Sequence, residues 1–178
     1  MIHLISGLPA HLLLVHAVVV FVPVAALLIV LSAAWPAARR KLGIITPIIA
    51  LITLVMVPIT TSAGHWLLDR LSFRESNALV MIHANLGDDL LAWVIGMFAG
   101  ALLVWGLPWL AKRDKASQLT GNTWIGAGIG LLAVAASVVA VVQVVRISEA
   151  GSRAVWSGTQ ICTDPVAPGG QCTSTLGQ

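Results

Sequence analysis

The chain has 178 residues, of which 58% are hydrophobic and only 10% are charged. Soluble domains carry about 25% charged residues, so this composition excludes an ordinary soluble globular protein. The formal net charge of +3 alone would suit a nucleic-acid-binding protein. Membrane orientation accounts for the basic residues instead, as argued below, and we expect no nucleic-acid partner.

Four apolar segments follow one another along the chain, at residues 10–35, 42–63, 86–107 and 124–145. A helix needs roughly 20 apolar residues to cross the hydrocarbon core of a bilayer, and each segment is near or above that length. The sequence therefore predicts an all-α fold, an integral membrane bundle of four antiparallel transmembrane helices in contact with the lipid bilayer. We expect residues 1–156 to form this single domain, and we find no internal repeat.

The charged residues predict how the spans are oriented. Six of the ten Lys and Arg residues fall in the first and third connections: Arg39, Arg40, Lys41, Lys112, Arg113 and Lys115. Six of the seven acidic residues fall on the opposite side: Asp69, Glu75, Asp88, Asp89, Glu149 and Asp164. Because Lys and Arg mark cytoplasmic connections, we expect both termini to lie outside the cytoplasm.

Small residues form faces on the last two spans. They recur at steps of three or four: Ala92, Gly96 and Gly100, then Gly126, Gly130, Ala133, Ser137 and Ala140. Such faces let helices approach one another closely in lipid, and we favour this interpretation. The alternatives are a slot for a flat cofactor and, on the fourth span, a docking face for a larger complex.

Residues 157–178 are expected to form an irregular extracytoplasmic tail, rich in Gly, Pro and polar residues. This tail holds the two cysteines of the chain, Cys162 and Cys172. Because an exoplasmic compartment is oxidising, we expect them to form a disulfide.

Histidines and acids gather at the predicted outer ends of the spans. Mixed imidazole and carboxylate ligands suit a transition metal, and the candidate ligands are His11, His16, His65, His83, Asp69 and Glu149. For b-type haem, which needs two histidines from different helices, the candidates are His16 with His65 or His83. A hydrogen-bond network that ties helix ends together is the alternative, since polar groups near the membrane boundary cost little.

The candidate functions follow from these groups. We find no HExxH, no GxSxG and no phosphate-binding loop, and we expect no independent catalytic activity. The leading hypothesis is a small redox or metal-binding module with haem b or a transition metal at its outer face. The second is a non-catalytic accessory subunit in a respiratory or transport membrane complex.

Two short motifs carry a family resemblance. The segment from His11 to His16, with Val15 between them, resembles the opening of the bacterial domain-of-unknown-function 2231 family, roughly His-Pro-x-x-Val-His-Phe-Pro. Leu12 and Val18 stand in place of its two prolines. The segment from Gly151 to Trp156 is similar to the family's Gly-Ala-x-Ala-Val-Trp.

Two further positions match that family as well. Glu149 occupies a position where it often has His or Asp, and His83 fits its usual histidine. The resemblance implies a four-span protein of the bacterial plasma membrane. Fusions of some members to Rieske-type or cytochrome c-type domains imply a role in electron transfer.

Overall fold

The structure is a computed structural model that describes residues 4–5, 8–70, 78–113 and 123–156. Its helices are α1 (Ala10–Ala34), α2 (Pro36–Leu42), α3 (Ile45–Leu68), α4 (Ala78–Arg113) and α6 (Thr123–Trp156). A short pairing of β1 (Leu4–Ile5) with β2 (Leu8–Pro9) precedes α1. Apart from these four residues, all the secondary structure described is helical, which confirms the prediction of an all-α fold.

Four of the helices are long and apolar enough to cross a membrane: α1, α3, most of α4, and α6. Their outward faces carry many large apolar side chains; Leu131 and Leu132, for example, are 70% and 71% exposed. Exposed apolar surface of this extent marks a partner or a membrane, and on helices of this length it suggests a lipid environment. The four candidate spans support a multi-pass membrane protein.

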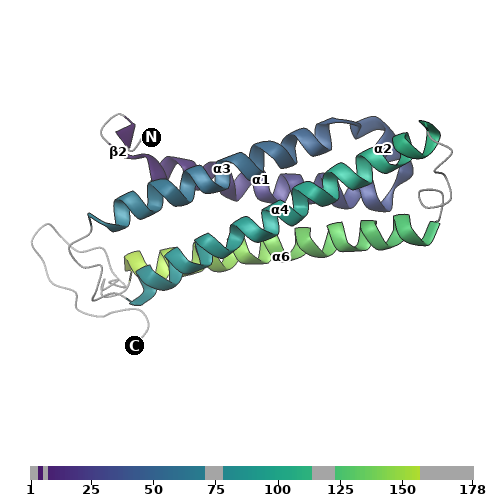
Figure 1. Ribbon diagram of the computed structural model, residues 1–178. Coiled ribbons are helices and arrows are strands. Elements are labelled where there is room, and N and C mark those ends of the chain that lie inside the picture. Colours follow the sequence, from purple (N-terminus) through teal and green to yellow (C-terminus); the bar gives the residue numbers. More distant parts are fainter. Residues whose placement is uncertain (1–3, 6–7, 71–77, 114–122, 157–178) are drawn as a thin grey trace, which may run out of the picture.

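The four long helices lie side by side, as Figure 1 shows. α1 packs against α3 and α6, and α4 packs against the same two helices. Near one end of the bundle, the Ser32 and Thr46 hydroxyls share a buried hydrogen bond of 3.1 Å between α1 and α3. The short α2 links these helices there; Pro36 occupies its first turn, and Gly43 follows it at a φ of 49°, which favours glycine.

The last two helices are longer than the apolar segments from which they were predicted. α4 begins at Ala78 rather than near residue 86, and α6 continues to Trp156 rather than ending near residue 145. The extension of α4 packs against α6, where the His83 side chain contacts the Ile147 carbonyl. This matters for the site, because His83 and Gly151 both lie in these extensions.

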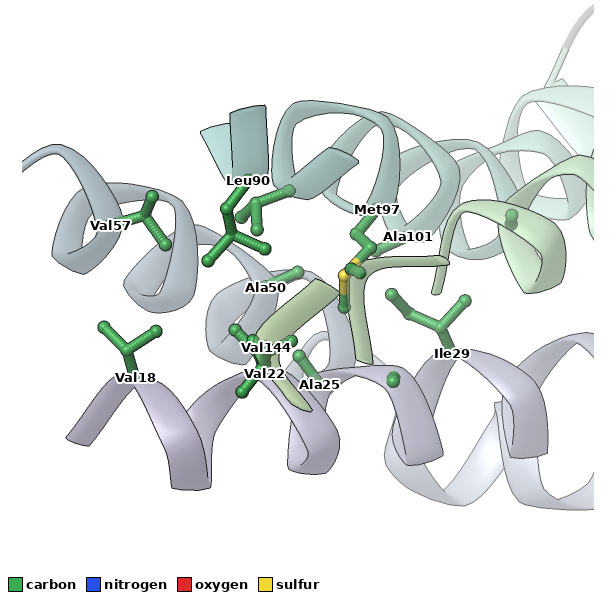
Figure 2. Packing of buried hydrophobic residues seen from close by; sticks show 14 of the residues in the cluster. Val18, Val22, Ala25, Ile29, Ala50, Val57, Leu90, Met97, Ala101 and Val144 are labelled. Carbon is green, nitrogen blue, oxygen red and sulfur yellow. The ribbon is translucent and has the colours of Figure 1, made fainter. Parts of the chain in front are cut away.

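The core is a continuous apolar cluster that runs along the centre of the bundle (Figure 2). Val22, Ile29 and Met97 are among its fully buried side chains. α4 and α6 approach each other closely: a Cβ added at Gly100 would lie 2.6 Å from the Cβ of Ala133, which is itself only 2% exposed. The small residues at this contact therefore serve helix packing and leave no slot for a flat cofactor.

The small residues of the fourth span are also not available as a docking face for a larger complex. Ala133, Ser137 and Ala140 are buried inside the bundle, and a Cβ added at Gly130 would contact Ala33 of α1 at 3.7 Å. These residues of the α6 face already pack against other helices of the same chain. They do not present a free surface to another protein.

Buried positions recur at a constant spacing when α1 is compared with α4 and when α3 is compared with α6. Buried positions Val18, Val22, Ala25, Ile29 and Ser32 of α1 correspond, 72 residues later, to buried Leu90, Val94, Met97, Ala101 and Val104 of α4. Thr46, Ala50, Thr53, Val57 and Ala63 of α3 correspond, 87 residues later, to Ala133, Ser137, Ala140, Val144 and Ala150 of α6. Spacing of this kind arises in any helix bundle, so burial alone does not establish a repeat.

Candidate functional site

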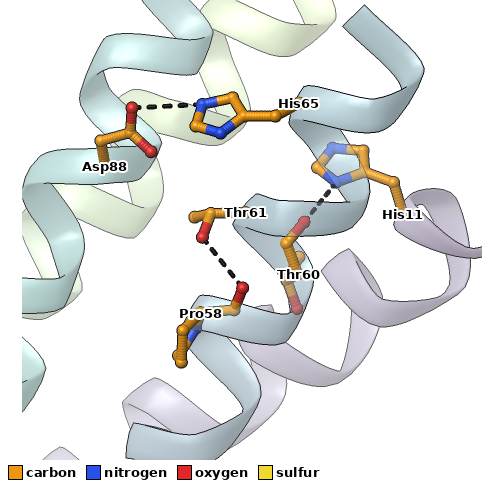
Figure 3. A network of polar contacts seen from close by, with 6 residues as sticks. All are labelled: His11, Pro58, Thr60, Thr61, His65 and Asp88. Carbon is orange, nitrogen blue, oxygen red and sulfur yellow. Dashed lines mark hydrogen bonds and ion pairs between the residues drawn. The ribbon is translucent and has the colours of Figure 1, made fainter. Parts of the chain in front are cut away.

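Three imidazoles from three helices gather at one end of the bundle, which we call the histidine end: His11 of α1, His65 of α3 and His83 of α4. The His11 Nδ1 lies 2.9 Å from the Thr60 carbonyl oxygen on α3 (Figure 3). A carbonyl oxygen can only accept a hydrogen bond, so Nδ1 of His11 carries the proton that it donates. The other ring nitrogen, Nε2, then has a free lone pair when the ring is neutral.

His83 makes the same contact in the other half of the bundle. Its Nδ1 lies 2.9 Å from the Ile147 carbonyl oxygen on α6 and donates to it. This ring also keeps its proton on Nδ1 and leaves Nε2 as the free nitrogen. In the part of the chain that the structure describes, neither His11 nor His83 has a hydrogen bond at Nε2.

Each of these rings lies against a glycine. A Cβ added at Gly64 would come within 2.9 Å of two His11 ring atoms, and one added at Gly151 within 2.9 Å of the His83 Nδ1. Each glycine follows, by four residues, the carbonyl that its histidine contacts. A glycine on the neighbouring helix therefore makes room for each ring to reach that helix's backbone.

The two rings also contact each other. Their centres are 6.2 Å apart and their planes meet at 89°, an edge-to-face arrangement. They come from α1 and α4, helices that lie across the bundle from each other and are brought together by α3 and α6. His11 and His83 are therefore two predicted ligands whose rings the fold brings into contact.

Two small cavities border both rings. One, of about 120 Å³, is also lined by His65, Asp88 and Gly87. The other, of about 70 Å³, reaches toward the apolar core at Val18 and Leu90. A cavity needs only about 10–15 Å³ to hold one water molecule, so either cavity has room for an ion with solvent ligands beside the rings. Pockets for organic ligands measure roughly 300–1,000 Å³, well above the size of either cavity.

His65 stands at the rim of the larger cavity. Its Nε2 lies 3.2 Å from the Asp88 Oδ2 across the gap between α3 and α4 (Figure 3). The two side chains are 51% and 49% exposed, and half-exposed pairs of this kind contribute about 0–1 kcal/mol to stability. The pair therefore contributes little to folding, and it places a third imidazole and a carboxylate beside the cavity.

The other predicted ligands lie elsewhere. His16 is exposed and its Nδ1 contacts the Leu12 carbonyl of its own helix at 2.6 Å. Asp69 is exposed just beyond the end of α3. Glu149 is exposed and pairs with Arg153 at 2.6 Å on α6. None of the three borders either cavity. Cys162 and Cys172 lie outside the described residues, and so does the disulfide predicted between them.

The positions of these side chains limit which cofactor the site can bind. Among the described residues, no group of three or more His, Cys, Asp or Glu side chains is arranged to hold a metal ion. Within the part of the chain that is described, the candidate ligands that converge are therefore two imidazoles, with His65 and Asp88 at the rim. The cavities are too small for haem, so a single ion fits the described geometry better than b-type haem does.

The residues that hold the two rings in place were not predicted from the sequence. Gly64, Gly151 and the Thr60 and Ile147 carbonyls received no role in the site, and Asp88 was counted among the acidic residues of the outer side but not among the ligands. A glycine next to His65 in an otherwise apolar helix was the available signal for Gly64. No signal pointed to the two carbonyls, because a backbone acceptor is the same at every position.

Comparisons of the chain with models of protein families, with curated proteins and with solved structures give no match. The resemblance to the domain-of-unknown-function 2231 family stays a prediction that rests on the two short motifs quoted above.

Proposed function

We propose that this chain is an integral membrane protein that binds a transition-metal ion at the histidine end, through Nε2 of His11 and Nε2 of His83. The observation that carries the proposal is the pair of imidazoles from opposite helices, each fixed at Nδ1 by a backbone carbonyl. Metal-binding histidines almost always donate their other ring N–H to a carbonyl, carboxylate or water.

The distance between the rings supports an ion between them. A metal–imidazole bond measures about 2.0–2.1 Å and each nitrogen lies about 1 Å from its ring centre, so two rings opposed across one ion have centres about 6 Å apart. The centres of His11 and His83 are 6.2 Å apart. The centre distance therefore suits an ion between the rings, and binding requires each ring to turn so that its Nε2 points at the ion.

The ligand chemistry narrows the choice of ion. Neutral imidazole suits Zn, Cu, Fe and Ni, whereas Mg and Ca prefer oxygen ligands. With two protein ligands, the remaining coordination positions fall to solvent in the larger cavity, or to the rim groups His65 and Asp88. Copper or iron in this position would make the protein a redox module, and zinc would not.

Metal analysis of the purified protein tests the proposal. We expect the full chain, extracted in mild detergent and stripped with a chelator, to take up about one equivalent of Cu(II) or Zn(II) per chain, as the single ring pair requires. Mass spectrometry of the dissolved metal after gel filtration measures the stoichiometry. No uptake above a membrane protein without histidines, or a Soret band from haem in the native preparation, would contradict the proposal.

We further propose that the four spans are antiparallel, with both termini and the histidine end outside the cytoplasm, in a bacterial plasma membrane. The contact of His11 with Thr60 at one end of α1 and α3, and of Ser32 with Thr46 at the other, supports opposite directions for these two helices. The basic residues of α2 support a cytoplasmic location for the end opposite the histidines.

Labelling of single cysteines in intact cells tests this topology. Both natural cysteines are first replaced by serine, and a new cysteine is then placed at Arg40 of α2 or at Asn85 of α4, both of which are exposed. We expect a membrane-impermeant maleimide to label Asn85→Cys readily and Arg40→Cys only after the cells are broken. The reverse pattern would contradict the proposed orientation.

A further inference from the structure

The contacts that hold the His11 and His83 rings occur at equivalent positions of the two halves of the bundle, α1 with α3 and α4 with α6. His83 follows His11 by 72 residues, the offset that relates the buried positions of α1 and α4. Gly151 and Ile147 follow Gly64 and Thr60 by 87 residues, the offset that relates α3 and α6. Burial alone would match in any bundle, but a histidine, its carbonyl and its glycine all match in the same register.

The arrangement that holds an imidazole is thus formed twice at the histidine end, once by α1 with α3 and once by α4 with α6. In each copy, the first helix supplies an imidazole, and the second supplies a glycine and the carbonyl one turn before it. The two imidazoles then meet at the centre. This internal repeat, which the sequence analysis did not find, explains why the ring contacts of His11 and His83 are alike.

We infer that Gly64 and Gly151 are positioning residues of the metal site, each keeping one imidazole on its backbone carbonyl with Nε2 left for the ion. The inference rests on the proposed metal binding and deepens it, since it assigns equal roles to the two halves. Only hydrogen at these positions leaves space for the rings, because an added Cβ would lie 2.9 Å from ring atoms that the neighbouring backbone also holds.

Moving either imidazole away from its backbone carbonyl changes the chemistry of the ring. Without the carbonyl contact, Nδ1 no longer retains the proton preferentially, and the ring can rotate. Loss of an outer partner of a metal-binding histidine typically lowers metal affinity about 10–100-fold. Each glycine should therefore affect metal binding strongly although it touches no metal itself.

The test replaces each glycine by alanine in the full chain and measures Cu(II) binding. We expect Gly64→Ala and Gly151→Ala each to lower the affinity about 10–100-fold. Electron paramagnetic resonance should show nitrogen couplings from two imidazoles in the parent protein and from one in each variant. A purely structural role would lower thermal stability without removing one of the two nitrogen couplings.

Two other glycines provide matched controls. Gly106 lies on α4 and borders neither cavity, and a Cβ there would meet nothing within 4 Å. Gly128 lies on α6, as Gly151 does, and a Cβ there would meet nothing within 4 Å. We expect Gly106→Ala and Gly128→Ala to bind Cu(II) like the parent. Folded Gly64→Ala and Gly151→Ala proteins with parental affinity and two nitrogen couplings would overturn the inference while leaving the proposed metal binding intact.

A second measurement needs no glycine variant and covers the case in which those variants fail to fold. Nitrogen NMR of the metal-free parent, labelled at histidine, reports which ring nitrogen carries the proton. We expect Nδ1–H for His11 and His83, each assigned by the signal lost in its His→Gln variant. Neutral rings with the proton on Nε2 at both positions would overturn the inference.

Discussion

Replacing either His11 or His83 by glutamine should lower the affinity for a transition-metal ion by at least about 100-fold, because losing a ligand costs at least as much as losing its outer partner. Glutamine is chosen because its amide N–H can still donate to the Thr60 or Ile147 carbonyl while the imidazole is removed. The two variants should fold like the parent. Competition with a chromogenic chelator measures the affinity of each purified protein.

His16 supplies the control for this experiment. It lies on the same helix as His11 but is exposed and borders neither cavity. We expect His16→Gln to bind the ion as the parent does. If His16→Gln and His11→Gln lose affinity equally, the ion is held by surface imidazoles rather than by the ring pair. If neither His11→Gln nor His83→Gln loses affinity, the proposed function is wrong.

Substitution of Gly100 should destabilise the bundle more than any other alanine substitution of a glycine within a span. A Cβ there would lie 2.6 Å from the Ala133 Cβ and 3.0 Å from its Cα, so the backbones of α4 and α6 must separate. Overpacking of this kind costs about 1–3 kcal/mol, and more where backbone has to move. Gly100→Ala should therefore unfold at a lower fraction of denaturing detergent in mixed micelles, followed by circular dichroism.

Gly106 and Ala133 provide the two controls for Gly100. A Cβ at Gly106, on the same helix, would meet nothing within 4 Å. Gly106→Ala should leave stability unchanged or raise it by about 0.5–1 kcal/mol through helix propensity. Adding Ala133→Gly to Gly100→Ala removes the 2.6 Å contact but leaves the 3.0 Å contact with the backbone, so it should restore part of the loss, a coupling that a double-mutant cycle measures. Additive losses in the double variant would show that this contact does not set the distance between α4 and α6.

The histidine end shows which part of the site could be predicted. The sequence placed His11, His65 and His83 near one level, because counting residues along each span gives the depth of a side chain. It did not select His11 over His16. α1 is apolar on every side, so its hydrophobic pattern does not tell which face points inward, and only packing against α3 and α6 turns His11 to the cavity.

The internal repeat shows a second limit of the sequence. The histidine pair recurs at an offset of 72 residues and the glycine pair at an offset of 87, as the burial of the helices does. No single offset aligns both helices of one half with those of the other, because Val104 and Ala133 lie 29 positions apart in the sequence whereas the equivalent Ser32 and Thr46 lie 14 apart. Few other residues match in kind, so the correspondence becomes visible only through burial and contacts.

The amino-acid sequence by itself determined the all-α fold and the number of candidate spans. Long apolar segments in lipid must satisfy their backbone groups within each segment, and a helix does so whatever its neighbours are. Only the tertiary structure decided which imidazoles meet, which carbonyls hold them and which glycines admit them. Those contacts depend on the rotation and separation of each helix, and close packing between side chains of different helices sets both.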